Sequence, residues 1–191
     1  TSQGAVHWIN ADARTSYGIN QSIVAPNVDK GGEFGSAVAV SGDGTYLVIG
    51  APGGPDDSTA LNRGTVYVYK YAKDGSSARY DLHQTLVPTA DSQLGARFGA
   101  EVSISSDGNT IAIASPLQHN DSTSVDEGRV YVYRLKNDVF YEHEALTSEL
   151  RDDIEFGTSL AISSDGADLL VGAPLYSGTV RKQGGVFHYN K

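Results

Sequence analysis

The strongest constraint on the fold is an internal repeat, because motifs that recur in fixed order predict copies of one structural unit. Three Phe-Gly pairs recur about every sixty residues, at Phe34-Gly35, Phe98-Gly99 and Phe156-Gly157. An Asp-Gly pair follows each of them, at Asp43-Gly44, Asp107-Gly108 and Asp165-Gly166. A Gly-Ala-Pro segment or its relative and then a Gly-x-Val-Tyr-Val-Tyr segment complete the unit, the last copy more loosely. The chain is therefore expected to contain three related units.

Each unit is expected to form four short β-strands. The Asp-Gly pair predicts the turn between the first two, because Gly tolerates a positive φ and Asp hydrogen-bonds to its own backbone. The second strand, at 46–50 in the first unit, is apolar on both faces and must be covered on both sides. The fourth, at 80–87, is more polar, as expected of an outer strand.

These strands predict an all-β fold, a β-propeller built of four-stranded antiparallel blades. A β-sandwich of similar hairpins is the alternative, but it leaves one face of each sheet wet, which conflicts with the two-faced second strands. We expect trailing strands of a preceding blade and a linker at 1–33, and blade repeats at 34–97 and 98–155. A partial repeat follows at 156–191, and all four segments form one propeller domain.

The alignment of the repeats makes two predictions that a structure can test. Val38, Val102 and Leu160 should be buried equivalents on first strands, and Tyr67 and Tyr131 should be equivalents on third strands. The expected strands number two, four, four and three along the chain. Because a closed propeller needs at least four blades, we expect an incomplete propeller, whose N-terminal blade is completed by missing chain or by another copy.

The ordered motifs resemble the FG-GAP repeat of integrin α-subunit propellers, and the similarity covers nearly the whole chain. The resemblance implies a β-propeller that is usually extracellular. Integrin-type blades often carry a calcium loop of the form Asp-x-Asp-x-Asp-Gly, whereas each loop here keeps one carboxylate, in a calcium-loop-poor variant of the repeat. Calcium prefers six to eight oxygen ligands, so the loops are interpreted as turns. Asp165 and Asp168, in the third loop, are the least implausible metal ligands, and no cofactor is expected.

Composition excludes several classes of function. The formal net charge is −9, and no cluster of Lys and Arg offers the phosphate contacts of a nucleic-acid-binding protein. The longest apolar runs are far shorter than a bilayer span, which argues against membrane insertion. The chain has no Cys, which excludes disulfides, thiolate zinc sites and cysteine nucleophiles.

Catalysis is not expected, because the five His residues are scattered and no nucleophile-elbow or His-Glu-x-x-His motif occurs. Binding is favoured, because propeller loops gather at the ends of the blades and loops carry function. The candidate ligand-binding loop residues are Asp56, Asp57, Asp121, Asp126 and Glu127. Solvated loops that keep an edge-rich protein soluble are the alternative. Of two glycosylation sequons, at Asn20 and Asn120, the second lies in a long polar loop and is the predicted modification site.

These observations predict a non-catalytic extracellular or cell-surface module that mediates adhesion or protein interaction, or builds a surface assembly. The expected partner is another protein or further copies of the chain. Two alternatives remain: an accessory propeller of a larger secreted enzyme, and a subunit of a filament or ring assembled through open blade edges.

Overall fold

The computed structural model describes residues 4–11, 17–26, 32–54, 63–88, 95–118, 127–148 and 154–191. Within these residues the chain is all-β, and no helix occurs. The strands are β1 (Ala5–Ala11), β2 (Tyr17–Val24), β3 (Val38–Val40), β4 (Tyr46–Ala51), β5 (Thr65–Asp74), β6 (Ser77–Leu86), β7 (Glu101–Ile104), β8 (Thr110–Ser115), β9 (Arg129–Lys136), β10 (Val139–Leu146), β11 (Ser159–Ile162), β12 (Asp168–Ala173) and β13 (Gly185–Asn190). Among the described residues there is also no helix long and apolar enough to cross a membrane.

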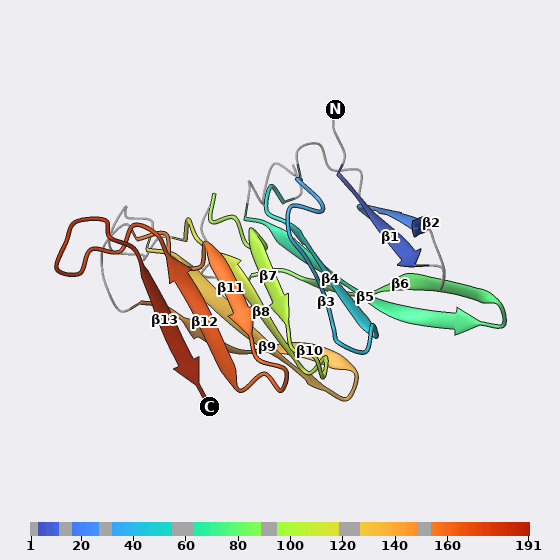
Figure 1. Ribbon diagram of the computed structural model, residues 1–191. Helices are drawn as coiled ribbons and strands as arrows, with labels where there is room; N and C mark the ends of the chain where they lie inside the picture. Colours follow the sequence, from blue (N-terminus) through green and yellow to red (C-terminus); the bar gives the residue numbers. More distant parts are fainter. Residues whose placement is uncertain are drawn as a thin grey trace.

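The strands form four antiparallel sheets in chain order. β1 and β2 form an N-terminal ribbon, β3–β6 the first blade, β7–β10 the second blade, and β11–β13 the C-terminal sheet. Figure 1 shows these sheets following one another across the molecule. The described residues thus confirm the expected strand numbers of two, four, four and three. The architecture is an open, incomplete β-propeller of four-stranded antiparallel blades.

Hydrophobic cores lie between successive sheets, because alternate side chains of a strand point to opposite faces. On β5, Val66 and Val68 pack toward the second blade, whereas Tyr67 and Tyr69 pack toward the N-terminal ribbon. Every residue of β4 and of β8 is buried, which confirms that these two second strands are covered on both faces. The prediction is wrong for the third second strand, β12, where Leu170 is 43% exposed.

The predicted register of the repeats is confirmed, but one burial prediction is wrong. Val38, Val102 and Leu160 lie on the first strands β3, β7 and β11, and Tyr67 and Tyr131 lie on the third strands β5 and β9. Val102 is buried and Leu160 is half-buried, whereas Val38 is 53% exposed. Val102 belongs to the core that contains Val48 of the first blade. The described N-terminal ribbon has no first or second strand that could cover Val38 in the same way.

The Phe-Gly pairs join each unit to the sheet before it. Phe98 and Phe156 are fully buried, and the backbone N–H of Phe98 donates to the carbonyl oxygen of Arg63 at 2.8 Å. A Cβ atom on Gly64 would overlap the carbonyl oxygen of Phe98, and one on Gly128 would overlap that of Phe156. Both positions therefore require glycine, because only glycine allows the two backbones to come so close.

Candidate protein-interaction surface

Most of the acidic loop residues predicted to bind a ligand lie outside the described residues. This applies to Asp56, Asp57, Asp121 and Asp126, and also to the predicted glycosylation site Asn120. Glu127 is described, and it is only 7% exposed. Its carbonyl oxygen accepts the N–H of Phe156 at 3.3 Å, so the Phe-Gly contact of the next sheet covers it. This burial does not fit the expected position on a ligand-accessible loop.

The Asp-Gly pairs form hydrogen-bonded turns between first and second strands. The Ser41 hydroxyl donates to Asp43 Oδ1 at 2.6 Å and accepts the N–H of Tyr46 at 3.0 Å. The backbone N–H of Thr45 donates to the same carboxylate at 2.9 Å. These hydrogen bonds, led by that of Ser41, lower the pKa of Asp43 to about 2. Ser105 and Ser163 likewise lower the pKa of Asp107 and of Asp165.

The two weak metal candidates have separate partners. Asp165 Oδ1 accepts the Ser163 hydroxyl at 2.8 Å and the N–H of Ala167 at 3.1 Å. Asp168 Oδ1 instead lies 2.7 Å from Nε2 of His188 on the neighbouring strand β13. Across the described part of the chain, no group of three or more His, Asp or Glu side chains is arranged to hold a metal ion.

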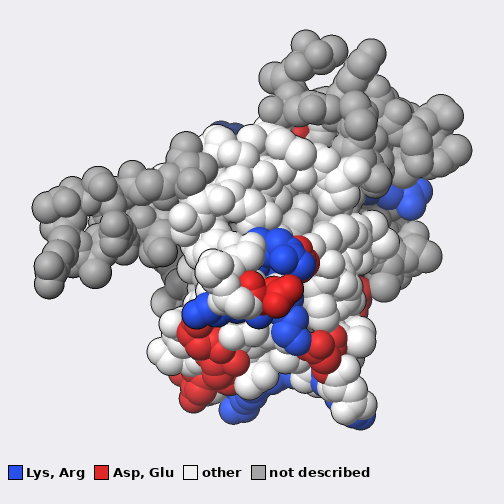
Figure 2. Space-filling view, turned by 90° about the vertical axis from the view of Figure 1, so that its right-hand side faces the viewer, with Lys and Arg blue, Asp and Glu red and all other residues white. Residues whose placement is uncertain are grey.

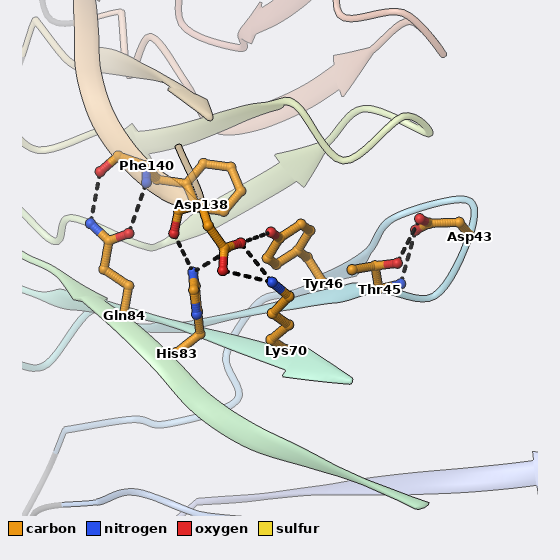
Figure 3. Close-up of polar contacts among 8 residues, drawn as sticks. All are labelled: Asp43, Thr45, Tyr46, Lys70, His83, Gln84, Asp138 and Phe140. Atoms are coloured by element: carbon orange, nitrogen blue, oxygen red, sulfur yellow. Dashed lines mark hydrogen bonds and ion pairs between the residues drawn. The ribbon is translucent and has the colours of Figure 1, made fainter. Parts of the chain in front are cut away.

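A polar cluster that the sequence did not indicate links the first and second blades (Figure 3). Asp138, in the β9–β10 turn, accepts Lys70 Nζ at 2.6 Å and the Tyr46 hydroxyl at 2.7 Å. Nε2 of His83 lies 2.9 Å from the carbonyl oxygen of Asp138. We call Tyr46, Lys70, His83 and Asp138 the interblade clasp. Nothing in the repeat motifs signals it, because none of its members belongs to the Phe-Gly, Asp-Gly, Gly-Ala-Pro or Gly-x-Val-Tyr-Val-Tyr segments.

Within the interblade clasp, the contacts keep Lys70 protonated, Asp138 ionised and Tyr46 neutral at neutral pH. The hydrogen bond from Lys70 lowers the pKa of Asp138, and the same bond raises the pKa of Lys70. Burial, followed by the hydrogen bond to Asp138, raises the pKa of Tyr46. An acid or base is most effective when its pKa lies near the working pH, and these shifts move the groups away from it. The interblade clasp is therefore arranged for attachment rather than for proton transfer.

A second contact between sheets repeats along the chain. Gln84 on β6 donates from Nε2 to the carbonyl oxygen of Phe140 at 2.7 Å and accepts the N–H of Phe140 at 2.9 Å. Gln21 on β2 makes the same pair of bonds with the backbone of Tyr80, at 2.9 and 2.7 Å. We call these contacts the glutamine clamps. In each, the side chain from one outer strand binds the backbone of the next outer strand along the chain.

The N-terminal end face contains apolar side chains that are exposed. Val38 and Val40 on β3 are 53% and 56% exposed, and Ile9 on β1 is 49% exposed. Figure 2 shows this end of the molecule, where acidic and basic side chains lie intermixed over the lower part and uncharged residues lie above them.

The C-terminal end face is also open. Leu170 on β12 and Val186 on β13 are 43% and 71% exposed. At the same positions of the second blade, Ala112 and Val130 are fully buried, because the C-terminal sheet covers them. Exposed side chains at positions that are buried elsewhere in the repeat mark both ends as surfaces that fit another sheet.

A cavity of about 750 Å³ opens between the N-terminal ribbon and the β5–β6 hairpin. Trp8, Tyr71 and Tyr80 line it together with Asn20 and Asp43. The Trp8 ring meets those of Tyr71 and Tyr80 edge to face, at centroid distances of 5.8 and 5.3 Å. Asn20, the first sequon residue, is exposed here. Aromatic rings beside an ionised carboxylate favour cationic groups.

Comparison with known proteins gives a family match and likenesses to solved structures. The crystal structure of Sqt1 from Saccharomyces cerevisiae, a WD40 propeller, aligns over 81% of this chain with 13% identity and a TM-score of 0.48. This chain spans 38% of the length of that one. The family model described as the FG-GAP repeat matches residues 18–69, from β2 to β5, a segment that contains Phe34-Gly35 and Asp43-Gly44. This match supports a β-propeller repeat of the FG-GAP type and, with it, a protein-interaction module.

Proposed function

We propose that the protein is a non-catalytic module, extracellular or on the cell surface, that binds protein partners through its open end faces. Adhesion and the building of a surface assembly are the two forms of this function. The observation that carries the proposal is the exposure of apolar side chains at positions that the inner sheets bury. Val38 is 53% exposed where Val102 is 4% exposed, and Val186 is 71% exposed where Val130 is fully buried.

The absence of catalysis is part of the proposal. In the described residues, the interblade clasp brings together four titratable side chains, and the pKa shifts of two of them keep Lys70 protonated and Asp138 ionised. The extracellular or cell-surface location is supported by the resemblance to integrin-type FG-GAP repeats. An extracellular or cell-surface location predicts a glycan at Asn120 when the protein is made in a glycosylating secretory host. Mass spectrometry of the wild-type chain and of Asn120→Gln tests this.

Assembly through the end faces is tested by sedimentation velocity over a range of concentrations. We expect wild-type particles larger than one chain, and we expect Val38→Asp and Leu170→Asp to shift them toward the monomer, because a buried unpaired charge is costly. Val139→Asp is the matched control: Val139 is also 53% exposed but lies on the outer strand β10. If the wild-type chain is a monomer at all concentrations, the partner is a different protein. If Val139→Asp dissociates the particles as strongly as Val38→Asp, the end faces are not the contact.

A further inference from the structure

The Asp-Gly dipeptide occurs four times in the sequence, in two different structural settings. Three copies form the turns between first and second strands, at Asp43, Asp107 and Asp165. The fourth copy, Asp74-Gly75, is not part of the repeat motifs and lies at the tip of the β5–β6 hairpin. The four copies therefore show how the fold changes the chemistry of one dipeptide.

An Asp-Gly pair can rearrange its own backbone. The glycine nitrogen attacks Cγ of the neutral aspartic acid, a C–N bond forms, and water leaves with the carboxyl hydroxyl and the amide proton. A second water then opens the succinimide ring at either carbonyl, which gives back aspartate or gives isoaspartate. Glycine favours the attack because it has no side chain to hinder it. The reacting atoms must also be able to approach each other, so hydrogen bonds that hold either group elsewhere prevent the reaction.

In the repeat turns, both reacting groups are held by hydrogen bonds. The N–H of Gly44 donates to the carbonyl oxygen of Ser41 at 2.9 Å, and the equivalent glycines of the other two turns make the same bond at 3.0 Å. The Asp43 carboxylate accepts the Ser41 hydroxyl at 2.6 Å and the Thr45 N–H at 2.9 Å. These bonds, led by that of Ser41, lower the pKa of Asp43 to about 2, which leaves little of the neutral acid.

The other two turns differ in how the carboxylate is held. The backbone and the side chain of Asn109 donate to the two oxygens of Asp107, each at 3.0 Å. Asp165 accepts the Ser163 hydroxyl at 2.8 Å and the Ala167 N–H at 3.1 Å, both on Oδ1. Among the three turns, Asp165 is therefore expected to be the least protected.

The Asp74-Gly75 pair lacks these constraints. Both residues are exposed, and no group within the described residues hydrogen-bonds to the Asp74 carboxylate or to the Gly75 N–H. The neighbouring Arg79 side chain donates to Asp81 instead, at 2.7 Å. A Cβ atom on Gly75 would meet no atom within 4 Å beyond its chain neighbours, so the backbone has room to move.

The tip of this hairpin projects beyond the rest of its blade. β5 pairs with β4 only as far as Lys70, and its last residues pair with β6 alone among the described strands. Beyond Tyr80, which a glutamine clamp holds, the β5–β6 hairpin has three further residue pairs, whereas β9–β10 has one beyond Phe140. In Figure 1 the tip extends past the ends of β3 and β4. A change at the tip therefore leaves the cores between the sheets intact.

We propose that Asp74-Gly75 is a modification site, at which the folded chain forms isoaspartate through a succinimide while the three repeat turns keep their aspartates. The product carries Cβ of residue 74 in the backbone and the α-carboxylate as a side group. Asp74 and Ser77 close the two-residue turn, so the extra backbone atom disturbs that pair first. The modified chain stays folded and presents an altered surface loop. The site includes none of the end-face residues and goes beyond the proposed function.

The test follows the folded 191-residue chain over several weeks at body temperature, in parallel with the same chain unfolded in guanidinium chloride at the same pH. Peptide mapping by mass spectrometry measures isoaspartate in the tryptic peptide 74–79 and in the peptides with the other three pairs. In the folded chain we expect isoaspartate at residue 74 to form about tenfold or more faster than at Asp43 or Asp107. Asp165 should lie between them. In guanidinium chloride the four sites should react at similar rates.

Two variants test the chemistry. Asp74→Glu keeps the charge but would require a larger ring, so it should remove the isoaspartate signal from its peptide and leave the other three sites unchanged. Ser163→Ala removes one hydrogen bond from the Asp165 carboxylate and should speed isoaspartate formation there about threefold or more. Heavy-oxygen water is used throughout, because each opening of the ring incorporates a heavy oxygen and so also reports the events that return aspartate.

The inference is overturned if residue 74 of the folded chain forms isoaspartate no faster than Asp43. It is also overturned if residue 74 reacts about tenfold or more slowly in the folded chain than in guanidinium chloride, because the fold would then protect the tip as well. Circular dichroism of the aged chain tests the remaining claim. Loss of the β-sheet signal in proportion to isoaspartate at residue 74 would show that the tip is needed for the fold.

Discussion

Single glycine residues at the start of the third strands determine how closely successive sheets approach. Gly64 and Gly128 have φ angles of 91° and 78°, and the next Phe-Gly pair lies directly against each of them. Gly184 holds the same strand position with φ 77°, but the nearest atom to a Cβ there would be the Pro174 carbonyl oxygen, at 3.4 Å. The three positions share one backbone conformation and differ in what covers them.

Replacing these glycines with alanine separates the cost of the φ angle from the cost of the close approach. We expect Gly184→Ala to lower the free energy of unfolding by about 1–2 kcal/mol, the cost of the left-handed conformation. Gly64→Ala and Gly128→Ala should lower it by more, because the methyl group must also displace the Phe98 or Phe156 backbone. Urea unfolding measures the difference. Equal losses at Gly64 and Gly184 would contradict this account of the Phe-Gly contact.

The Asp43 carboxylate should make stability depend on acid pH. Its pKa is lowered to about 2 in the folded chain, from an ordinary value of 3.8. A depressed pKa stabilises the fold above the unfolded pKa, and this contribution is lost as pH falls through the folded pKa. We expect Asp43→Asn to be less stable than wild type at pH 7, with a difference that shrinks between about pH 4 and pH 2.

Thermal unfolding of wild type and Asp43→Asn across this pH range tests the prediction. Asp81→Asn is the control, since Asp81 is exposed and has a hydrogen bond from the exposed Arg79 side chain. It should change stability by less than about 0.5 kcal/mol. A stability difference for Asp43→Asn that stays constant from pH 7 to pH 2 would show that the carboxylate is not what holds the turn.

At the scale of strands, the outer hairpins share a local irregularity that serves the glutamine clamps. The β1–β2, β5–β6 and β9–β10 pairs each contain a register shift, and the residue left out of the pairing is Asn20, His83 or His143. Gln21, Gln84 and Glu144 follow these residues directly. A bulge redirects the strand and its side chains, so the outer strand can reach the backbone of the next sheet.

Replacing the residue at a clamp position should lower the free energy of unfolding only where that residue binds the backbone of the next outer strand. We expect Gln84→Ala to lower the free energy of unfolding by about 1–3 kcal/mol, because the N–H and C=O of Phe140 lose their partner in a part-buried site. Glu144→Ala is the matched control and should cost less than about 0.5 kcal/mol in the free chain. Chemical denaturation of the two variants provides the comparison. A loss at Glu144 as large as that at Gln84 would mean that these residues act through their own sheet.

For the molecule as a whole, the environment of each repeat position depends on its place in the stack of sheets. Val102→Ala should lower the free energy of unfolding by about 1–3 kcal/mol, because it removes buried methyl groups and leaves a cavity. Val38→Ala should cost less than about 0.5 kcal/mol at the same strand position, because Val38 is 53% exposed. Both are measured by urea unfolding at low protein concentration. An equal cost would show that another strand covers Val38 in solution.

Chelation should leave the melting temperature essentially unchanged. Serine hydroxyls and backbone N–H groups occupy the carboxylates of the Asp43 and Asp165 turns, and each turn has one acidic residue at the Asp-Gly pair. Differential scanning calorimetry with and without EDTA tests this. A large fall in melting temperature that calcium restores and magnesium does not would contradict it, because a ligand that binds only the folded state stabilises that state.

The sequence by itself determined the strands, their order and their pairing within each unit. Asp43-Gly44 is a turn and Val66 to Tyr69 alternates as predicted, because consecutive antiparallel strands depend on local turns and on a two-residue periodicity. The tertiary structure decided the contacts between units. Lys70 and Asp138 lie 68 positions apart, and they meet because the two blades pack face to face. It also decided the exposure of Val38 and the burial of Glu127. Both depend on which sheet lies against the residue, and no short motif encodes that.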